Sequence, residues 1–326
     1  MVTLAPFADE QARALINLRQ HYETWRDAER AARALPYDLR RKTVDGREYL
    51  YEIADRSGNG RSLGRWDDAA AERFETYRAE KAALKDRIGR TRERVEESGR
   101  IARAVRVPQL VSTPGPILRE ADLRGLLDGQ LLVVGTNCLL AYQQEAAARF
   151  DLPDETVDFD LAWAGATRPD NAPIWETLKA VDPTFTVNTE REFQARNRDA
   201  YEVELLVAPS RAATLGPREK PYPIPLPEQE WLLLGKPVDQ VVPCRDATAA
   251  RLVVPDPRWF ALHKLWLGNQ AKRNPLKRGK DLQQGNAVLD AVAEAMPQYP
   301  LDAEFEASIP QELRRYWNEW KAGRAS

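Results

Sequence analysis

The stretch of sequence that most constrains the fold runs from residue 131 to residue 163. An apolar, β-rich run breaks at Gly135, a helix is predicted to follow, and a second apolar strand then carries Asp158 and Asp160. Alternate residues of a strand point to the same face, so these two aspartates are predicted to stand side by side while the apolar residues around them face the core. Two carboxylates held so close repel each other unless a cation sits between them. We therefore expect Mg²⁺ here, because this ion binds carboxylate oxygens together with water and substrate phosphates.

Both features of this stretch also have a purely structural interpretation. A turn from strand to helix needs glycine for steric reasons alone, and a solvated edge strand alternates in the same way as Asp158 and Asp160 do. Thr136 and Asn137 are good N-terminal caps, and the backbone N–H groups of a helix start favour a phosphate. The glycine turn and the acid pair occur in the order that phosphate and metal chemistry needs, and this order favours the functional interpretation.

Composition excludes several classes of protein. The chain has 326 residues, of which 43% are hydrophobic and 30% charged, as in an ordinary globular enzyme with room for two domains. No apolar run approaches the roughly 20 residues of a transmembrane helix, and the first ten residues lack the regions of a signal peptide. We therefore expect a cytoplasmic protein without membrane partners.

Histidine and cysteine chemistry is nearly absent from the sequence. Cys138 and Cys244 make neither a disulfide framework nor a zinc cluster, so we expect both to be reduced and buried. His21 and His263 are the only histidines, which leaves carboxylates, lysines and arginines to carry any chemistry. The net charge of −2 argues against a nucleic-acid binder that uses its whole surface, but it leaves a local basic patch open.

The N-terminal region, residues 1–107, is predicted to be a helical hairpin with a short β segment. Apolar residues at spacings of three and four indicate helices over about 7–35 and 67–103, with a strand over 48–55 between them. The second helix has a thin apolar stripe and a high charge density, so we expect it to pair with the first rather than enter a deep core. Such a hairpin is typical of a scaffold or of a contact between copies of the chain.

The central region, residues 108–210, alternates strands with helices and predicts an α+β or α/β fold with a small mixed sheet flanked by helices. We expect helices over 117–128, from Gly135 to Phe150 and over 175–181, and strands over 156–162, 185–187 and 200–208. In the last strand Glu202 and Glu204 face the side opposite to the apolar residues. Glu204 is thus available as a third carboxylate on a neighbouring strand.

The last region, residues 211–326, is predicted to hold a linker and a C-terminal helical domain. Residues 209–230 are rich in proline and are expected to be a surface excursion. The segment from 258 to 280 contains no acid and seven basic residues, namely Arg258, Lys264, Lys272, Arg273, Lys277, Arg278 and Lys280. Most of these are interpreted as a solvated helix face. His263 lies among aromatic and aliphatic residues and is predicted to be a core histidine with its hydrogen bonds satisfied.

These residues carry a resemblance to a known family. A glycine turn, a helix, an Asp-x-Asp strand and an acid on a later strand resemble the nucleotidyltransferase fold of the DNA polymerase β superfamily. The segment Gly135-Thr-Asn-Cys-Leu-Leu-Ala-Tyr142 is more closely similar to a family of bacterial nucleotidyltransferase-like proteins. The similarity covers most of residues 45–295 and includes the segments Arg61–Gly64, Val181–Phe185, Tyr201–Leu205, Pro255–Lys264 and Lys277–Asp281.

The resemblance implies an enzyme that transfers a nucleotidyl group from an NTP such as ATP to an RNA end, a protein or a small molecule. Asp158, Asp160 and Glu204 would be catalytic and would hold two Mg²⁺ ions, or Mn²⁺ in their place. Glu204 stands where aspartate is common. The expected nucleotide-binding residues are Gly135, Thr136, Asn137, Lys264, Lys277 and Lys280.

Two alternatives stay open at this point. The chain could be a non-catalytic module that keeps the nucleotidyltransferase fold and binds a nucleotide or a partner, for example within a toxin–antitoxin or phage-defence system. A homo-oligomer formed through the N-terminal helical hairpin is compatible with either interpretation.

Overall fold

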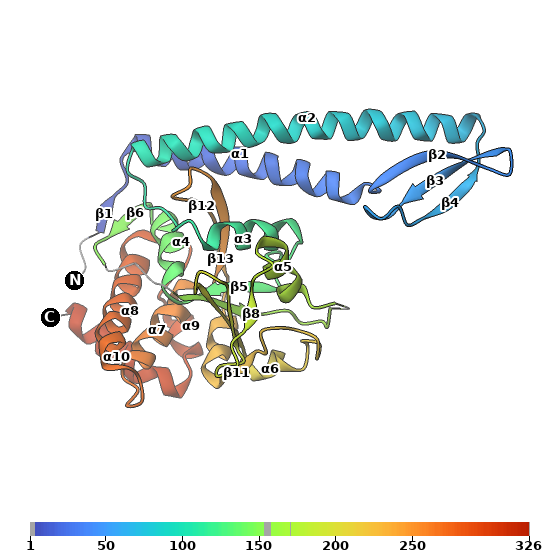
Figure 1. Cartoon of the computed structure of the whole chain (residues 1–326). Coiled ribbons are helices and arrows are strands. Elements are labelled where there is room, and N and C mark those ends of the chain that lie inside the picture. Colours follow the sequence, from blue (N-terminus) through green and yellow to red (C-terminus); the bar gives the residue numbers. More distant parts are fainter. Residues whose placement is uncertain (1–3, 153–157, 170, 326) are drawn as a thin grey trace. The chain divides into compact units, whose positions relative to one another are not determined.

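The computed structural model describes residues 4–152, 158–169 and 171–325. The chain is a mixed α/β protein with several sheets (Figure 1). It divides into two units, one of residues 20–98 and the other of residues 1–19 and 99–326. In the described part of the chain, no helix combines the length and the apolar character that crossing a membrane requires.

The unit of residues 20–98 contains the greater part of two long helices and a small antiparallel sheet. The helices are α1 (Asp9–Ala34) and α2 (Asp68–Ala104), and the strands are β2 (Asp38–Val44), β3 (Arg47–Ile53) and β4 (Gly60–Arg65) in the order β2-β3-β4. The two helices contact each other, since Arg92 donates to Glu29 at 3.0 Å and the side chains of His21 and Ser98 are 2.7 Å apart. Both helices and β3 lie where the sequence predicts them. Strands β2 and β4 were not predicted, because charged residues on both faces hide the alternation of a strand.

The larger unit is organised around one mixed sheet in the order β5-β7-β10-β9-β8, with β11 also paired to β10. Strands β7 and β10 run parallel, and β5 lies antiparallel to β7. The strands are β5 (Leu131–Val134), β7 (Asp158–Trp163), β8 (Thr186–Val187), β9 (Gln194–Arg196), β10 (Glu202–Val207) and β11 (Ile224–Pro225). Every residue of β5 is buried, so this strand lies inside the core and places Gly135 at its end.

Helices and a β-hairpin surround this sheet. The hairpin is β12 (Val238–Pro243) with β13 (Ala249–Val254), and β1 (Leu4–Pro6) pairs with β6 (Ala148–Phe150). The helices are α3 (Pro114–Leu123), α4 (Cys138–Glu145), α5 (Pro173–Val181), α6 (Pro209–Ala212), α7 (Pro257–Gly268), α8 (Pro275–Ala295), α9 (Ala303–Ser308) and α10 (Gln311–Ala325). One cluster of buried residues extends from Leu110 to Trp317 and so includes both the sheet and the C-terminal helices. The expected boundary after residue 210 stays a prediction.

Some predicted elements differ from those observed. The helix expected to continue to Phe150 ends at Glu145, because Ala147 has φ of 47° and the chain then turns into β6. The proline-rich segment 209–230 is not a structureless excursion, since it contains α6, β11 and part of the 3₁₀ helix η2 (Pro227–Leu233). Residues 156 and 157 of the expected acidic strand lie outside the described residues.

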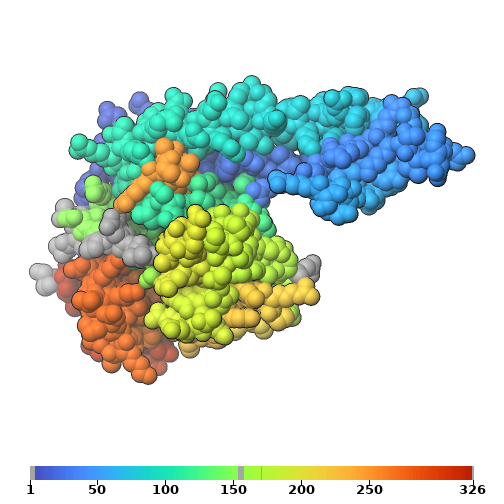
Figure 2. Space-filling view, viewed as in Figure 1, coloured from blue at the N-terminus to red at the C-terminus, as the bar shows by residue number. Residues whose placement is uncertain are grey.

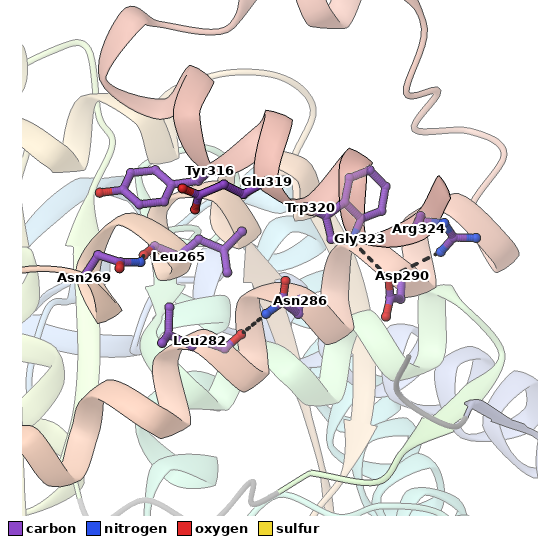
Figure 3. Close-up of a pocket in the computed structure, with 10 residues that line it drawn as sticks. All are labelled: Leu265, Asn269, Leu282, Asn286, Asp290, Tyr316, Glu319, Trp320, Gly323 and Arg324. Carbon is purple, nitrogen blue, oxygen red and sulfur yellow. Dashed lines mark hydrogen bonds and ion pairs between the residues drawn. The ribbon is translucent and has the colours of Figure 1, made fainter. Parts of the chain in front are cut away.

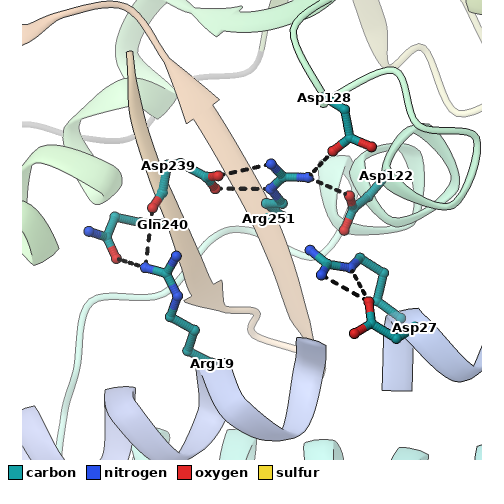
Figure 4. A network of polar contacts seen from close by, with 8 residues as sticks. Arg19, Asp27, Asp122, Asp128, Asp239, Gln240 and Arg251 are labelled. Atoms are coloured by element: carbon teal, nitrogen blue, oxygen red, sulfur yellow. Dashed lines mark hydrogen bonds and ion pairs between the residues drawn. The ribbon is translucent and has the colours of Figure 1, made fainter. Parts of the chain in front are cut away.

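Arg251 on β13 connects the hairpin to α3 and to the turn before β5 (Figure 4). Its guanidinium donates to both carboxylate oxygens of Asp239 at 2.9 Å, to Asp122 at 2.9 Å and to Asp128 at 2.6 Å. Asp122 is fully buried, and the Arg251 side chain is 12% exposed. The strand that leads to Gly135 is therefore linked to the hairpin by an ionic network in which Asp122 is fully buried, Arg251 is largely buried, and Asp128 and Asp239 are partly exposed.

We expect Arg251→Ala to lower the free energy of unfolding by about 3 kcal/mol, because it leaves the carboxylate of Asp122 buried without this cation. Urea unfolding monitored by tryptophan fluorescence measures the change. Arg315→Ala is the control, since Arg315 is 74% exposed in its pair with Glu319 and such surface pairs contribute about 0.5 kcal/mol. Equal losses in the two variants would contradict the prediction.

Candidate active site

The acids of the two parallel strands lie in register on one face of the sheet. Asp160 on β7 is the neighbour of Glu204 on β10, and Asp158 is the neighbour of Glu202. These four side chains are half-buried, whereas Phe159 and the apolar residues of β10 on the opposite face are fully buried. Alternation in the sequence thus places three candidate acids together, on the face that the period of two predicts.

A pocket of about 280 Å³ collects most of the predicted site residues. Its lining includes Gly135, Asp158, Asp160, Glu204, Lys264 and Lys277. Thr136, Asn137 and Lys280 do not line it. The pocket combines residues of β7 and β10 with residues of α7 and α8. In Figure 2 the orange C-terminal region and the yellow-green segment adjoin at the surface.

Gly135 is required by the close approach of Asp160. The glycine has φ of +74°, and a Cβ added to it would lie 2.2 Å from Asp160 Oδ2. Gly135 to Asn137 form the 3₁₀ helix η1 ahead of α4. Asn137 occupies the N-cap position of α4, as predicted, but its side chain makes no capping hydrogen bond, and Thr136 is not an N-cap. Both side chains are buried, and Thr136 Oγ1 accepts a hydrogen bond from Gln284 at 3.4 Å. The glycine therefore lets the carboxylate lie against the strand end.

The pKa of Asp160 is raised from 3.8 to about 7. Burial is the largest cause, the negative charge of Glu204 is the second, and Asp158 adds to them, while Lys264 and Lys277 act in the opposite direction. Burial and the two neighbouring carboxylates thus outweigh the two lysines, so the charged form of Asp160 is disfavoured, and a cation bound beside it would favour that form.

The cations that face the acids are fixed by ion pairs. Lys264 Nζ is 2.8 Å from Asp281 Oδ1, with both side chains buried, and Arg273 Nε is 2.8 Å from Asp281 Oδ2. Although burial alone would raise the pKa of Asp281, these two cations lower it. Lys277 Nζ lies 3.3 Å from Asp158. Arg273, which the sequence interpretation left on a solvated face, therefore belongs to the pocket.

Sequence reasoning missed Asp281 and the amide of Gln194. Asp281 is the residue directly after the acid-free segment that ends at Lys280, so the composition of that segment does not reveal the acid that pairs with Lys264 and Arg273. Gln194 Nε2 donates to Glu204 Oε1 at 2.5 Å from the neighbouring strand β9. An alternating acid pattern cannot reveal such a partner, because strand pairing brings it there.

His263 also lines the pocket, and one part of its predicted role is wrong. The residue is 7% exposed, and burial, followed by the charge of Lys264, lowers its pKa from 6.5 to about 3. Neither ring nitrogen has a hydrogen-bond partner in the described part of the chain. It is a core histidine, as expected, but its hydrogen bonds are not satisfied. Cys138 and Cys244 are free and buried, as predicted.

The acids fit a hard cation in their chemistry, although they do not form a closed cage. Across residues 4–152, 158–169 and 171–325, no group of three or more histidine, cysteine, aspartate or glutamate side chains is arranged to hold a metal ion. Asp158 and Asp160 nevertheless offer carboxylate oxygens on the same face of the sheet as Glu204. Mg²⁺ is commonly bound by one or two carboxylates, with water and substrate phosphates as its other ligands. The pair therefore fits Mg²⁺ together with a phosphate ligand.

A second cavity of about 450 Å³ lies among α7, α8 and α10 (Figure 3). One acid that lines it, Asp290, accepts hydrogen bonds from Trp320 Nε1 at 3.0 Å and from Arg324 at 3.3 Å. These contacts join α10 to α8, so Asp290 has a structural role in this larger cavity. The smaller pocket contains the acid face and is the candidate site.

Comparison with known proteins identifies a family for the part of the chain that contains this pocket. A family model described as Nucleotidyltransferase matches residues 113–309, which include the acid-bearing strands and helices α7 and α8. Comparisons with curated proteins and with solved structures gave no match.

Gly135→Ala is expected to destabilise the protein by about 2 kcal/mol or more, because alanine disfavours the positive φ and its Cβ would displace Asp160. Thermal unfolding measures the effect. Gly279→Ala is the matched control, since nothing lies within 4 Å of its added Cβ and alanine favours the interior of helix α8. A Gly135→Ala protein as stable as wild type would rule out the close approach.

Raising the pH from about 4 to about 7 is expected to reduce the stability of the metal-free protein through Asp160. Its carboxyl loses a proton near pH 3.8 in the unfolded chain but near pH 7 in the folded protein. The folded state therefore binds more protons in this window, and stability falls as the pH rises. Melting temperatures in EDTA at several pH values, compared with those of Asp160→Asn, measure the contribution. Identical pH profiles of the two proteins would contradict the raised pKa.

Proposed function

We propose that this chain, which belongs to the nucleotidyltransferase family whose model matches residues 113–309, transfers a nucleotidyl group from an NTP to an acceptor in a reaction that depends on a divalent metal ion. The observation that carries the proposal is the pocket in which Asp158, Asp160 and Glu204 face the cations of α7 and α8. The proposed fold is that of the DNA polymerase β superfamily, supported by the mixed sheet and by the in-register pairing of Asp160 with Glu204.

The charges of the pocket suit an NTP bound together with Mg²⁺. Asp158 and Asp160 are the proposed metal ligands, and the ion would bridge them to the triphosphate and stabilise the charge that develops on it. Lys264, Arg273 and Lys277 line the same pocket and would bind phosphate oxygens. A substrate that carries its own negative charge and metal ion would therefore neutralise both groups of residues at once.

The residues around the acids have distinct proposed roles. Gln194 holds Glu204 in place through its hydrogen bond, so that Glu204 can accept a proton from an acceptor hydroxyl or contribute to metal binding. Asp281 holds Lys264 and Arg273 in fixed positions before substrate arrives. Lys277, which is 53% exposed, would move from Asp158 to a phosphate when a metal ion takes its place at the carboxylate.

A non-catalytic nucleotide-binding module is the second candidate. It is favoured by the contacts that two of the acids already make, since Asp158 is paired with Lys277 and Glu204 with Gln194. Such a module would bind an NTP through the cations and give no product.

Purified protein incubated with labelled NTPs, Mg²⁺ or Mn²⁺ and cell extract is expected to form a labelled product. Asp158→Asn and Asp160→Asn should each reduce the rate at least about a hundredfold, because a metal ion contributes several kcal/mol to stabilising the transition state. Glu202→Gln is the matched control, because Glu202 is the strand neighbour of Asp158 but forms an ion pair with Arg196 and does not line the pocket.

Two outcomes would count against the proposed enzyme. If labelling is unchanged in Asp160→Asn, the acids do not take part in the reaction. Calorimetry that detects NTP binding without dependence on metal, together with no labelled product, would favour the non-catalytic module.

A further inference from the structure

Apolar side chains make up a large part of the pocket that holds the acids. Phe193, Leu206, Ile224, Leu232 and Phe260 line it together with the charged residues. They come from the segment before β9, from β10 and β11, from η2 and from α7. A triphosphate and a metal ion need none of this surface, so the apolar lining is suited to another part of the substrate.

Two buried polar side chains of the same pocket lack hydrogen-bond partners within the described residues. They are His263, at both ring nitrogens, and Gln229, at Oε1. His263 is 7% exposed and Gln229 is 4% exposed. Folded proteins rarely bury polar atoms without partners, because these atoms lose their hydrogen bonds to water. Both residues line the one pocket that also carries the acids, so a bound ligand can supply the missing partners.

The ring of His263 packs against two tryptophans. It stacks on Trp266 with ring centroids 6.3 Å apart and meets the edge of Trp231 at 6.4 Å. Its pKa, lowered to about 3 by burial, keeps the ring neutral, so that one nitrogen donates and the other accepts. Gln229 Oε1 can only accept. Together the two residues offer an uncharged set of hydrogen-bonding groups.

We propose that His263 and Gln229 bind the edge of the nucleobase and thereby select which NTP the protein uses. This inference rests on the proposed function. A base has two flat apolar faces and an edge with both donors and acceptors, which matches apolar walls with neutral polar groups between them. A phosphate has no donor for Gln229 Oε1 and is drawn to Lys264, Arg273 and Lys277. A sugar carries hydroxyls around its ring and would leave some of them against apolar walls.

We expect substitutions of these two residues to weaken nucleotide binding without lowering the stability of the free protein. Gln229→Leu and His263→Phe each remove a buried group that has no partner, so the free protein should unfold at the same temperature or a higher one. A merely structural role for either side chain would instead lower the unfolding temperature. Nucleotide binding should weaken in both variants, because the base loses a hydrogen bond.

The test is titration calorimetry with ATP, GTP, CTP and UTP, and with inorganic tripolyphosphate as a probe without a base, all in Mg²⁺. Wild type should bind at least one NTP more tightly than tripolyphosphate. Gln229→Leu and His263→Phe should each weaken that NTP about tenfold and leave tripolyphosphate unchanged. Gln283→Leu is the control, since Gln283 is exposed on α8 and does not line the pocket.

Other results would overturn the inference in ways that separate it from the proposed function. If both variants bind NTP and tripolyphosphate equally more weakly and unfold at a lower temperature, the two side chains have a structural role. Base recognition would be contradicted if both variants bind NTP as tightly as wild type, or if wild type binds every NTP no better than tripolyphosphate. Neither result would contradict nucleotidyl transfer. A wild type that binds neither NTP nor tripolyphosphate would overturn both.

Discussion

The pocket depends on the crowding of Asp160 between a strand end and a second carboxylate. Asp160 Oδ2 would lie only 2.2 Å from the Cβ of any other residue at position 135. Glu204 is the neighbour of Asp160 in register on β10. Burial of the carboxylate and, after it, the negative charge of Glu204 make this arrangement electrostatically unfavourable, and both raise the pKa of Asp160. The surrounding core enforces it, because β5 is buried along its whole length and Phe159 holds β7 in place from the opposite face. Strain of this kind persists where the rest of the fold determines the geometry.

The opposing cations are ordered by a device that is local to the C-terminal helices. Asp281 binds Lys264 and Arg273 at once, so two positive charges are positioned on α7 and on the loop before α8 without help from the acids. Two buried pairs that share one carboxylate contribute little net stability, since desolvation offsets their attraction. Their effect is to fix where the charges point. The pocket therefore holds an anionic face and a cationic face that are each supported by their own contacts, and the proposed substrate, with its phosphates and a metal ion, would bind to both.

How much the sequence predicts depends on the range of the interaction. The alternation of Asp158 and Asp160 with apolar residues is a local pattern with a period of two, and so is that of Glu204, which is why all three acids were predicted on one face. Asp281 and Gln194 were missed because their partners are brought to them by helix packing and strand pairing. Gln229 was missed for a similar reason. It lies in a proline-rich segment that suggests a surface loop, yet η2 buries its side chain against the pocket.

The pocket contains charged residues and neutral polar residues, and these two sets suit different tasks. The charged residues suit the reaction, and the neutral residues suit the choice of nucleotide. In the proposed reaction the acids and cations would interact with groups that every NTP shares, so they would not distinguish one nucleotide from another. Discrimination between nucleotides requires polar groups that the wrong ligand leaves without a hydrogen-bond partner. A buried polar group without a partner costs more free energy than a hydrogen bond to the right ligand contributes. His263 and Gln229 are of this kind, and they belong to α7 and η2 rather than to the acidic strands. Substitutions at these two positions could therefore change the nucleotide that is used while the acid face and its chemistry stay the same.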